Sequence, residues 1–260
     1  MTTLLRRFIG TLGLVLITCT GMASAAPMNL VLGDGTEVSM RVFPASGDTL
    51  LLWFACDEGQ GTWEAKSAAK LTARQIETWL PDMLGAHFLP SAPSSMESIP
   101  EREIAELIEH AVKTSGKRVY LIGAGRGALT VLLGARAWQQ GKSHATQHAL
   151  GGVVLFYPEL YAAPPTPGAE PEYHPVVKAT HLPLVVMQGE RSPGRWWLNH
   201  LKQALEQGGS KVETRLLPGV RGYFFVRQDQ TPEETAMAEK LPTLILDALT
   251  QLTTLRGDAP

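Results

Sequence analysis

Three glycines alternate with other residues directly after a short apolar run in the middle of the chain. The apolar run is 119–122, and the glycines are Gly123, Gly125 and Gly127. A long apolar stretch follows at 128–138, so the segment predicts a buried strand, a sharp turn and a helix. Backbone amides and the helix dipole at such a turn can hold a substrate or an anion. We therefore expect the functional site at this turn.

The same glycines match the fingerprint G-x-G-x-x-G/A of dinucleotide-binding proteins. That fingerprint needs an acidic residue about 20 positions later, which binds the ribose. No Asp or Glu occurs between Ala128 and Pro158. The predicted strand also follows a hairpin and two other strands, whereas the fingerprint normally opens its unit. A dinucleotide-binding protein stays an alternative, and we expect no cofactor.

Predicted strands and helices alternate along the rest of the chain. A hairpin is expected at 28–44, because Asp34 and Gly35 separate two runs of alternating apolar residues. Further strands are predicted at 49–55, 76–80, 152–157, 183–188 and 212–217, and helices at 66–73, 101–114, 196–207 and 233–252. This order specifies an α/β fold with a doubly wound, mostly parallel sheet and a site along the carboxyl ends of its strands.

The order of these elements resembles the α/β-hydrolase fold over nearly all of the chain after residue 25. The nucleophile of that family lies on a G-x-S-x-G turn, which corresponds here to 123–127, with Gly125 in the place of the serine. The resemblance places the catalytic acid at Ser192 and the catalytic base at Arg221. An arginine stays protonated and cannot act as a base, and no histidine follows His200.

Because all three positions of the triad are altered together, we expect a non-catalytic protein built on this fold, which binds a small ligand or a partner protein. An anion is one candidate ligand. The alternative is an active esterase or thioesterase-type hydrolase that uses other residues of the same cleft. Four serines are available to it, although their spacing supports none of them: Ser91, Ser94, Ser95 and Ser192.

Charged and polar residues at the strand ends are the candidates for ligand binding. They are Cys56, Asp57, Ala124, Arg126, Glu159, Arg191 and Arg195. Arginines beside helix N-terminal amides can hold an anion, but they can equally pair with acidic residues at the same edge as a structural network. Cys56 is a candidate nucleophile for which burial as a small apolar residue is favoured. His144 and His148 lack a third ligand, so no metal site is expected.

The N-terminus has the pattern of a secretory signal. Arg6 and Arg7 precede an apolar run, and the small residues at 23–25 predict cleavage after Ala25. We therefore expect a signal peptide at 1–25, one domain at 26–260, and a periplasmic or secreted protein that meets the membrane only through the cleaved signal. A lipid anchor at Cys19 is not expected, since Thr18 stands where the lipoprotein pattern has a smaller residue.

The charge of the chain gives no indication of a nucleic-acid partner. The whole sequence has a formal net charge of −2, and without residues 1–25 it retains 21 basic and 25 acidic residues. Proteins that bind nucleic acids normally carry a basic patch or an excess of basic residues. Cys56 is the single cysteine after residue 25, so the domain cannot form an internal disulfide.

Overall fold

The structure of the chain is a computed structural model that describes residues 25–140, 142–166 and 168–257. The predicted signal peptide and Cys19 lie outside this described part, except for Ala25. Within the described residues, no helix combines the length and the apolar character needed to cross a membrane.

Eight strands form one sheet, in the order β1-β2-β4-β3-β5-β6-β7-β8. The β1–β2 and β2–β4 pairs are antiparallel, and the other neighbours are parallel. The prediction of a mostly parallel sheet with an N-terminal hairpin is therefore confirmed. The strands are β1 Ala26–Val31, β2 Glu37–Phe43, β3 Thr49–Trp53, β4 Ile76–Pro81, β5 Arg118–Ala124, β6 Leu150–Phe156, β7 Leu184–Gly189 and β8 Val212–Leu217.

Both faces of the central strands are apolar and buried. In β3, Leu50 and Leu52 face one core cluster while Leu51 and Trp53 face the other. Successive side chains of a strand point to opposite faces, so a strand that is buried on both sides is apolar throughout. The strand that leads into the glycine turn, β5, is buried in the same way from Val119 to Ala124.

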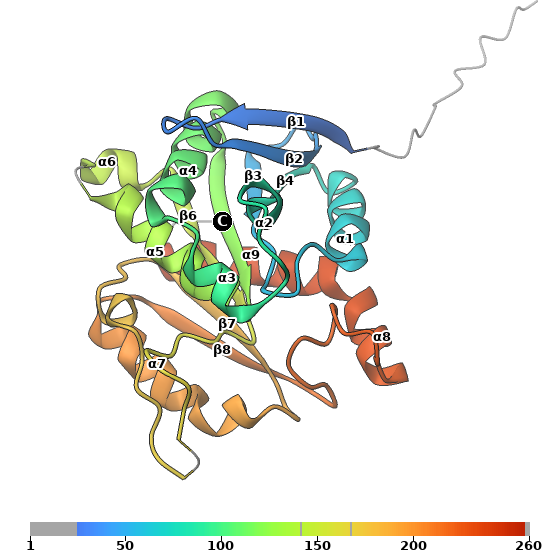
Figure 1. Cartoon of the computed structure of the whole chain (residues 1–260), viewed down its shortest axis with the longest axis vertical. Coiled ribbons are helices and arrows are strands. Elements are labelled where there is room, and N and C mark those ends of the chain that lie inside the picture. Colours follow the sequence, from blue (N-terminus) through green and yellow to red (C-terminus); the bar gives the residue numbers. More distant parts are fainter. Residues whose placement is uncertain (1–24, 141, 167, 258–260) are drawn as a thin grey trace, which may run out of the picture.

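Helices cover both faces of the sheet (Figure 1). Helices α4 and α5 pack against one face, and α1, α8 and α9 against the other. The longer helices are α1 Thr62–Thr72, α4 Glu101–Ser115, α5 Gly127–Gln139, α7 Leu198–Gln207, α8 Pro232–Glu239 and α9 Leu241–Arg256. Short helical segments are α2 Met83–Ala86, α3 Pro93–Glu97, α6 His144–Gln147, η1 Pro175–Lys178 and η2 Pro193–Trp197.

The prediction of a single terminal helix at 233–252 is wrong, because two helices, α8 and α9, meet at Lys240. Pro242 lies in the first turn of α9. A proline inside one continuous helix would lack a backbone donor and would clash with the preceding turn, so the chain ends α8 and starts a new helix. Similarly, the helix expected to start at residue 196 starts at Leu198, after the 3-10 turn η2.

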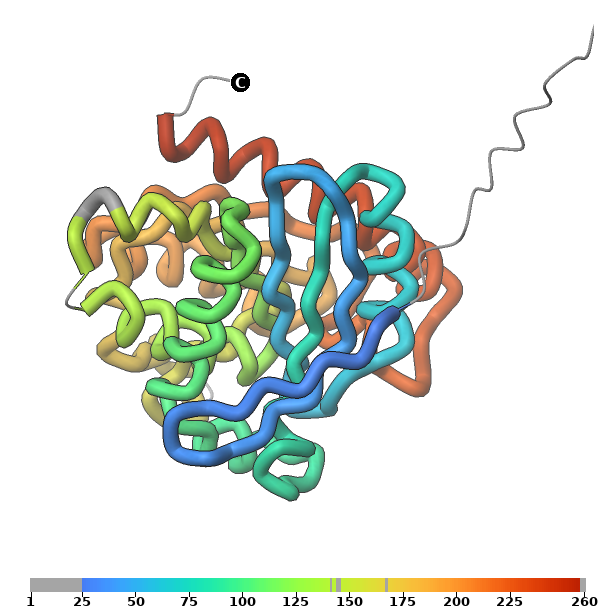
Figure 2. Tube along the Cα trace, turned by 90° about the horizontal axis from the view of Figure 1, so that it is seen from above, coloured from blue at the N-terminus to red at the C-terminus, as the bar shows by residue number. Residues whose placement is uncertain are grey.

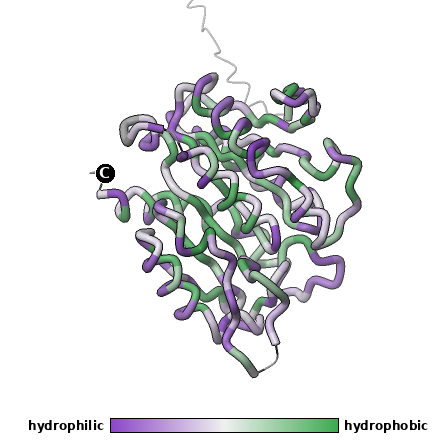
Figure 3. Tube along the Cα trace, turned by 60° about the vertical axis from the view of Figure 1, so that its left-hand side comes forward, coloured by the Kyte–Doolittle hydropathy of each residue, from purple (hydrophilic) through white to green (hydrophobic). Residues whose placement is uncertain are grey.

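The β1–β2 hairpin and the C-terminal helix α9 lie on opposite sides of the molecule (Figure 2). The hairpin extends the sheet at one edge, where β2 pairs with β4. Hydrophobic segments occupy the middle of the molecule, and hydrophilic ones are frequent on the outer helices and loops (Figure 3). The loops at the carboxyl ends of β3, β5, β6, β7 and β8 therefore rest on a fully packed core.

Candidate functional site

The turn between β5 and α5 has the backbone of a nucleophile elbow. Gly125 adopts a left-handed conformation, with φ +53°, which glycine reaches without the steric penalty of other residues. A Cβ atom on Gly127 would collide with the carbonyl oxygen of Ala55. The elbow thus lies directly against the loop that follows β3, and this contact brings Cys56 and Asp57 beside it.

Tyr223 fills the space where a side chain on Gly125 would project. A Cβ atom on Gly125 would lie 2.5 Å from the hydroxyl oxygen of Tyr223 and 2.7 Å from the ring carbon that carries this oxygen. Tyr223 comes from the loop after β8, in which the resemblance to α/β-hydrolases places the base. A phenol therefore occupies the position at which a hydrolase of this fold would present its nucleophile.

Two carboxylates bind the Tyr223 hydroxyl. Its oxygen lies 2.9 Å from Asp57 Oδ1 and 3.1 Å from Glu159 Oε1. A phenol has one proton, so it donates to one carboxylate at a time. We call Asp57, Tyr223 and Glu159 the carboxylate–phenol cluster.

The backbone amide directly after Gly125 is already hydrogen-bonded within the protein. In hydrolases of this fold, that amide is one donor of the oxyanion hole. Here it belongs to Arg126 and donates to Asp57 Oδ1 at 3.2 Å. Asp57 is buried, so its carboxylate takes the place that a substrate oxyanion would occupy. Any oxyanion formed in this cleft needs other donors.

Tyr157 holds the ring of Tyr223 in place. The two rings lie 4.9 Å apart at 32°, and both residues have positive φ, +39° for Tyr157 and +60° for Tyr223. Such backbone strain in residues other than glycine concentrates at functional sites. Burial, and then the charges of Glu159 and Asp57, raise the pKa of Tyr223 well above its ordinary value. Its phenol therefore stays protonated and remains a hydrogen-bond donor.

A cleft of about 550 Å³ opens beside the cluster, at the carboxyl ends of β5 to β8. Tyr223, Glu159 and Arg126 line it, together with Tyr161 and the prolines of the loop after β6. The Glu159 side chain is 35 % exposed, so it reaches both the cluster and the solvent-filled space. Enzyme sites are typically concave with a few convergent polar groups, and this cleft has that form.

Most of the arginines that were expected to bind an anion are engaged with the protein itself. Arg126 forms ion pairs with Glu97 at 3.0 Å and with Glu159 at 3.2 Å. Arg195 donates to the carbonyl oxygen of Glu190 and stacks on Trp196. Arg191 also lines the cleft, and its side chain has no hydrogen bond or ion pair with another described residue.

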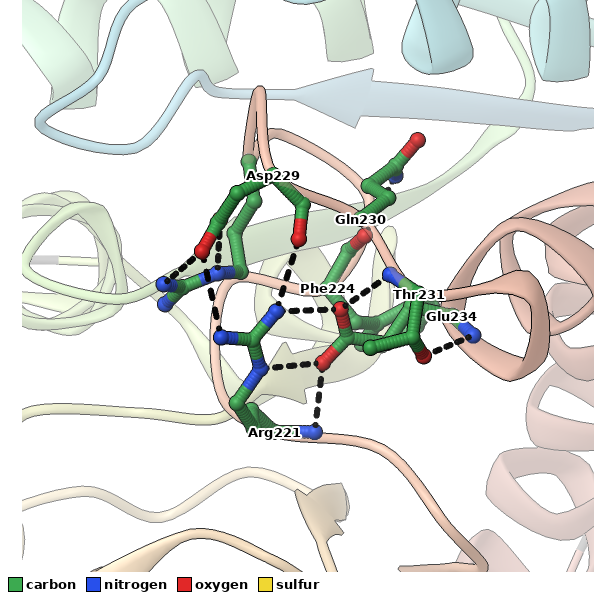
Figure 4. A network of polar contacts seen from close by, with 7 residues as sticks. Arg221, Phe224, Asp229, Gln230, Thr231 and Glu234 are labelled. Carbon is green, nitrogen blue, oxygen red and sulfur yellow. Dashed lines mark hydrogen bonds and ion pairs between the residues drawn. The ribbon is translucent and has the colours of Figure 1, made fainter.

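Arg221 is a structural anchor of the loop that carries Tyr223 (Figure 4). Its guanidinium binds both carboxylate oxygens of the fully buried Glu234 at 2.7 Å, and Asp229 at 3.2 Å. Glu234 also forms a capping box with Thr231 at the start of α8. Bidentate pairs of this kind are strong and geometrically specific. Arg221 lines the cleft, but its charge is neutralised within this network.

The remaining predicted residues contribute differently. Cys56 is buried outside the lining of the cleft, and burial raises the pKa of its thiol. Ala124 is buried at the end of β5. Ser192 lies in the cleft wall, 8 % exposed, and its hydroxyl has no hydrogen-bond partner. Among the described residues, no serine is hydrogen-bonded to a histidine, and no group of three His, Cys, Asp or Glu side chains could hold a metal ion.

Comparisons with solved structures show that the chain has the α/β-hydrolase fold. The apo form of Thermogutta terrifontis esterase 2 matches with a TM-score of 0.62 and 15 % identity, over 94 % of this chain and 100 % of that chain. A Pyrobaculum calidifontis esterase matches with a TM-score of 0.64 and 12 % identity, over 89 % and 86 %. The T. terrifontis esterase phosphorylated by paraoxon matches with a TM-score of 0.59 and 12 % identity, over 87 % and 94 %.

Sequence comparisons give no further information on the family. No family model matches the chain, and no curated protein matches it in sequence.

The expectation of a non-catalytic binding protein is contradicted by the structural comparisons, in which the similar proteins are esterases and hydrolases. That expectation rested on the three positions of the triad. It counted Asp57 and Glu159 only as candidates for ligand binding and did not include Tyr223. The comparisons favour the alternative of an active hydrolase over a non-catalytic protein.

The sequence analysis missed Tyr223 and Tyr157 as site residues. Both follow strand ends, where α/β folds place their functional groups. Tyr223 follows Gly222, which gives the backbone more freedom, and Tyr157 precedes Pro158, which restricts it. The position of an aromatic residue beside such a strand end was the available signal. It does not specify which tyrosine reaches the elbow, since that depends on the path of the loop after β8.

Proposed function

We propose that this α/β-hydrolase fold carries an ester hydrolase that acts through Asp57, Tyr223 and Glu159. One observation carries the proposal: the Tyr223 hydroxyl lies at the nucleophile position of the elbow, within hydrogen-bond distance of both carboxylates. A carboxylate can act as a general base, and a neutral phenol can donate a hydrogen bond. Both functions assist the cleavage of an ester by water.

The proposed reaction is a direct attack by water. Glu159, at the open side of the cluster, takes a proton from a water molecule, and the water oxygen attacks the carbonyl carbon. The neutral phenol of Tyr223 turns its single proton from the carboxylates to the carbonyl oxygen and donates a hydrogen bond to it as negative charge develops there. Glu159 then returns the proton to the leaving alkoxide, which gives an acid and an alcohol. No covalent intermediate forms, because Gly125 carries no nucleophile.

A cavity beside the cleft, with apolar and polar side chains in its wall, supports a substrate whose acyl group has an apolar part. This cavity has about 280 Å³, and Met96, Ile99, Leu129 and Leu133 form much of its wall. Arg126 and Tyr161 line both this cavity and the cleft. An ester whose acyl group enters the cavity would therefore place its carbonyl group near Arg126.

Arg191 supports an anionic group on the alcohol side of the substrate. It is exposed in the cleft wall next to Ser192, whose buried hydroxyl has no hydrogen-bond partner, and its charge also acts on Glu233. A guanidinium and a hydroxyl together can bind a carboxylate. We expect Arg191→Gln to raise the KM of a carboxylate-bearing ester and to leave that of a neutral ester unchanged; an equal effect on both would contradict this assignment.

A general esterase assay tests the proposed reaction. The purified protein should hydrolyse 4-nitrophenyl butyrate, and Glu159→Gln and Tyr223→Phe should each lower kcat by about 100-fold, since positioned acid–base groups contribute at least that much. Glu172→Gln, which alters an exposed carboxylate outside the cluster and the lining of the cleft, is the matched control. Absence of turnover in the unmodified protein, or full activity in both variants, would refute the proposal.

Labelling with paraoxon separates this chemistry from that of a serine hydrolase. One of the similar structures is an esterase phosphorylated by paraoxon. Because Gly125 carries no hydroxyl group, this protein should still turn over 4-nitrophenyl butyrate after treatment with paraoxon, and its mass spectrum should show no phosphorylated adduct. An adduct that abolishes turnover would show that a nucleophilic side chain attacks the substrate, in contradiction to the direct attack by water.

We also propose that the protein acts in the periplasm or outside the cell. The support is the order of residues 1–25, in which two arginines, an apolar run and small residues follow one another. N-terminal sequencing of the mature protein should begin at Ala26. A mature chain that retains Met1 would contradict the export of the protein.

A further inference from the structure

A second cavity lies at the opposite end of the same strands. It has about 280 Å³ and is formed where β6, β7 and β8 begin and where α5 and α9 end. Strands of six or seven residues separate it from the catalytic cleft by roughly 20 Å, at about 3.3 Å per residue. The two sites therefore share no lining residue, and this cavity plays no part in the proposed hydrolysis.

Basic side chains line this cavity, and none of the described residues in its wall is acidic. His148, His181, Lys211 and Arg256 come from four separate segments of the chain. Lys211 and His181 are exposed, and neither side chain is bonded to another described residue. The ammonium group of Lys211 and the imidazole of His181 are therefore available to a ligand.

The guanidinium of Arg256 is held in a fixed position at the wall of the cavity. Its Nη1 donates to the carbonyl oxygen of Leu150 at 2.9 Å and to that of His148 at 3.3 Å, and its Nη2 lies 3.5 Å from His148 Nδ1. A cation fixed in this way loses little conformational entropy when a ligand binds.

A buried amide in the same wall has no partner. Gln139 lines the cavity, is 5 % exposed, and its Oε1 has no hydrogen-bond partner. Its side-chain nitrogen makes no hydrogen bond to another described residue either. That nitrogen can donate to an anionic ligand in the cavity, whereas the unpaired oxygen is an acceptor and cannot bind one.

We propose that this cavity binds the phosphate group of a small phosphate monoester. The ammonium group of Lys211, the imidazole of His181 and the amide nitrogen of Gln139 can donate into the space, and the fixed guanidinium of Arg256 adds positive charge at its wall. Three phosphate oxygens can accept from donors on several sides, whereas a planar carboxylate offers two. The volume exceeds that of the phosphate alone, since one water-sized group takes about 30 Å³, so the rest of the monoester also has room.

Isothermal titration calorimetry with glycerol 3-phosphate at constant ionic strength tests this site. We expect saturable binding of one equivalent, which Lys211→Gln and Gln139→Leu each weaken by about tenfold, or about 1.4 kcal/mol. Lys70→Gln removes the same charge from an exposed position on α1 that lies outside the lining of the cavity. This matched control should change the dissociation constant by less than about twofold.

Two results would overturn the proposal. One is the absence of saturable binding up to about 10 mM glycerol 3-phosphate, since a site with a millimolar dissociation constant would be saturated at that concentration. The other is an equal loss of affinity in Lys70→Gln and Lys211→Gln. Such a result would mean that the net charge of the protein attracts the phosphate without a specific site. Sedimentation with phosphatidylglycerol vesicles distinguishes the source of the phosphate: binding to vesicles that depends on Lys211, without binding of glycerol 3-phosphate, would also refute a small-molecule site.

Discussion

Substitution of Gly125 by alanine tests whether Tyr223 occupies the nucleophile position. The new Cβ atom would lie 2.5 Å from the Tyr223 hydroxyl oxygen and 2.8 Å from a second ring carbon. A left-handed alanine costs about 1 to 2 kcal/mol, and overpacking of a filled site adds about 1 to 3 kcal/mol. We expect Gly125→Ala to lower the free energy of unfolding by about 3 kcal/mol.

A double-mutant cycle separates the two contributions. In a Tyr223→Ala background the steric part should vanish, which leaves about 1 to 2 kcal/mol from the backbone. In Tyr223→Phe it should persist, because the ring carbons at 2.7 and 2.8 Å remain. Gly116→Ala is the control for the backbone cost, since Gly116 has φ +64° and a Cβ atom added to it would have no neighbour within 4 Å. Urea unfolding followed by tryptophan fluorescence measures each value. The same loss for Gly125→Ala in all three backgrounds would refute the proposed location of the phenol.

Three further predictions concern ionisable groups. Glu234→Gln should destabilise the fold by roughly 2 kcal/mol, because it weakens charge-assisted hydrogen bonds to Arg221. This pairing lowers the pKa of Glu234 to about 2. The contribution of the pair to the stability of the unmodified protein is therefore complete above the ordinary pKa of a glutamate and should be lost as the pH falls towards 2, as acid titrations of stability would show. Cys56 should react with a thiol reagent at pH about 8 only after unfolding, because burial raises its pKa; rapid labelling of the folded protein would contradict this. Burial also raises the pKa of Glu64, so the folded state holds its proton more tightly than the unfolded state does. Stability should therefore fall as the pH rises above the ordinary pKa of a glutamate. Glu64→Gln should reduce that decrease, as measured by urea unfolding at a series of pH values.

The fold was predictable because its main signals are local. The buried runs of β3, β5, β6 and β7 are apolar on both faces, which indicates a parallel sheet covered by helices. Asp34 and Gly35 specified the hairpin through the conformations that its turn requires. The break between α8 and α9 was missed, although Pro242 was the available signal, because the apolar period continues across it.

The elbow was predictable, but the groups around it were not. Alternating glycines after an apolar run predicted the turn at Gly125. The carboxylate–phenol cluster instead joins residues 57, 159 and 223, which lie far apart in the chain, and only the packing of three loops brings them together. The pairing of Arg221 with Glu234 was equally hidden, since their separation of 13 residues follows no helical or strand period. Contacts of this kind depend on the tertiary path of loops, for which a single sequence carries no periodic signal.

The anchoring of the loop after β8 has a consequence for attempts to introduce a serine triad. A serine at Gly125 would collide with Tyr223, and a histidine at Arg221 would leave the buried carboxylate of Glu234 without its bidentate partner. Either substitution alone would therefore lower the stability of the protein before the second one could supply any activity. Single-step laboratory evolution towards conventional serine catalysis should stall in this chain, and it should proceed only from a starting variant in which positions 223 and 234 have already been replaced.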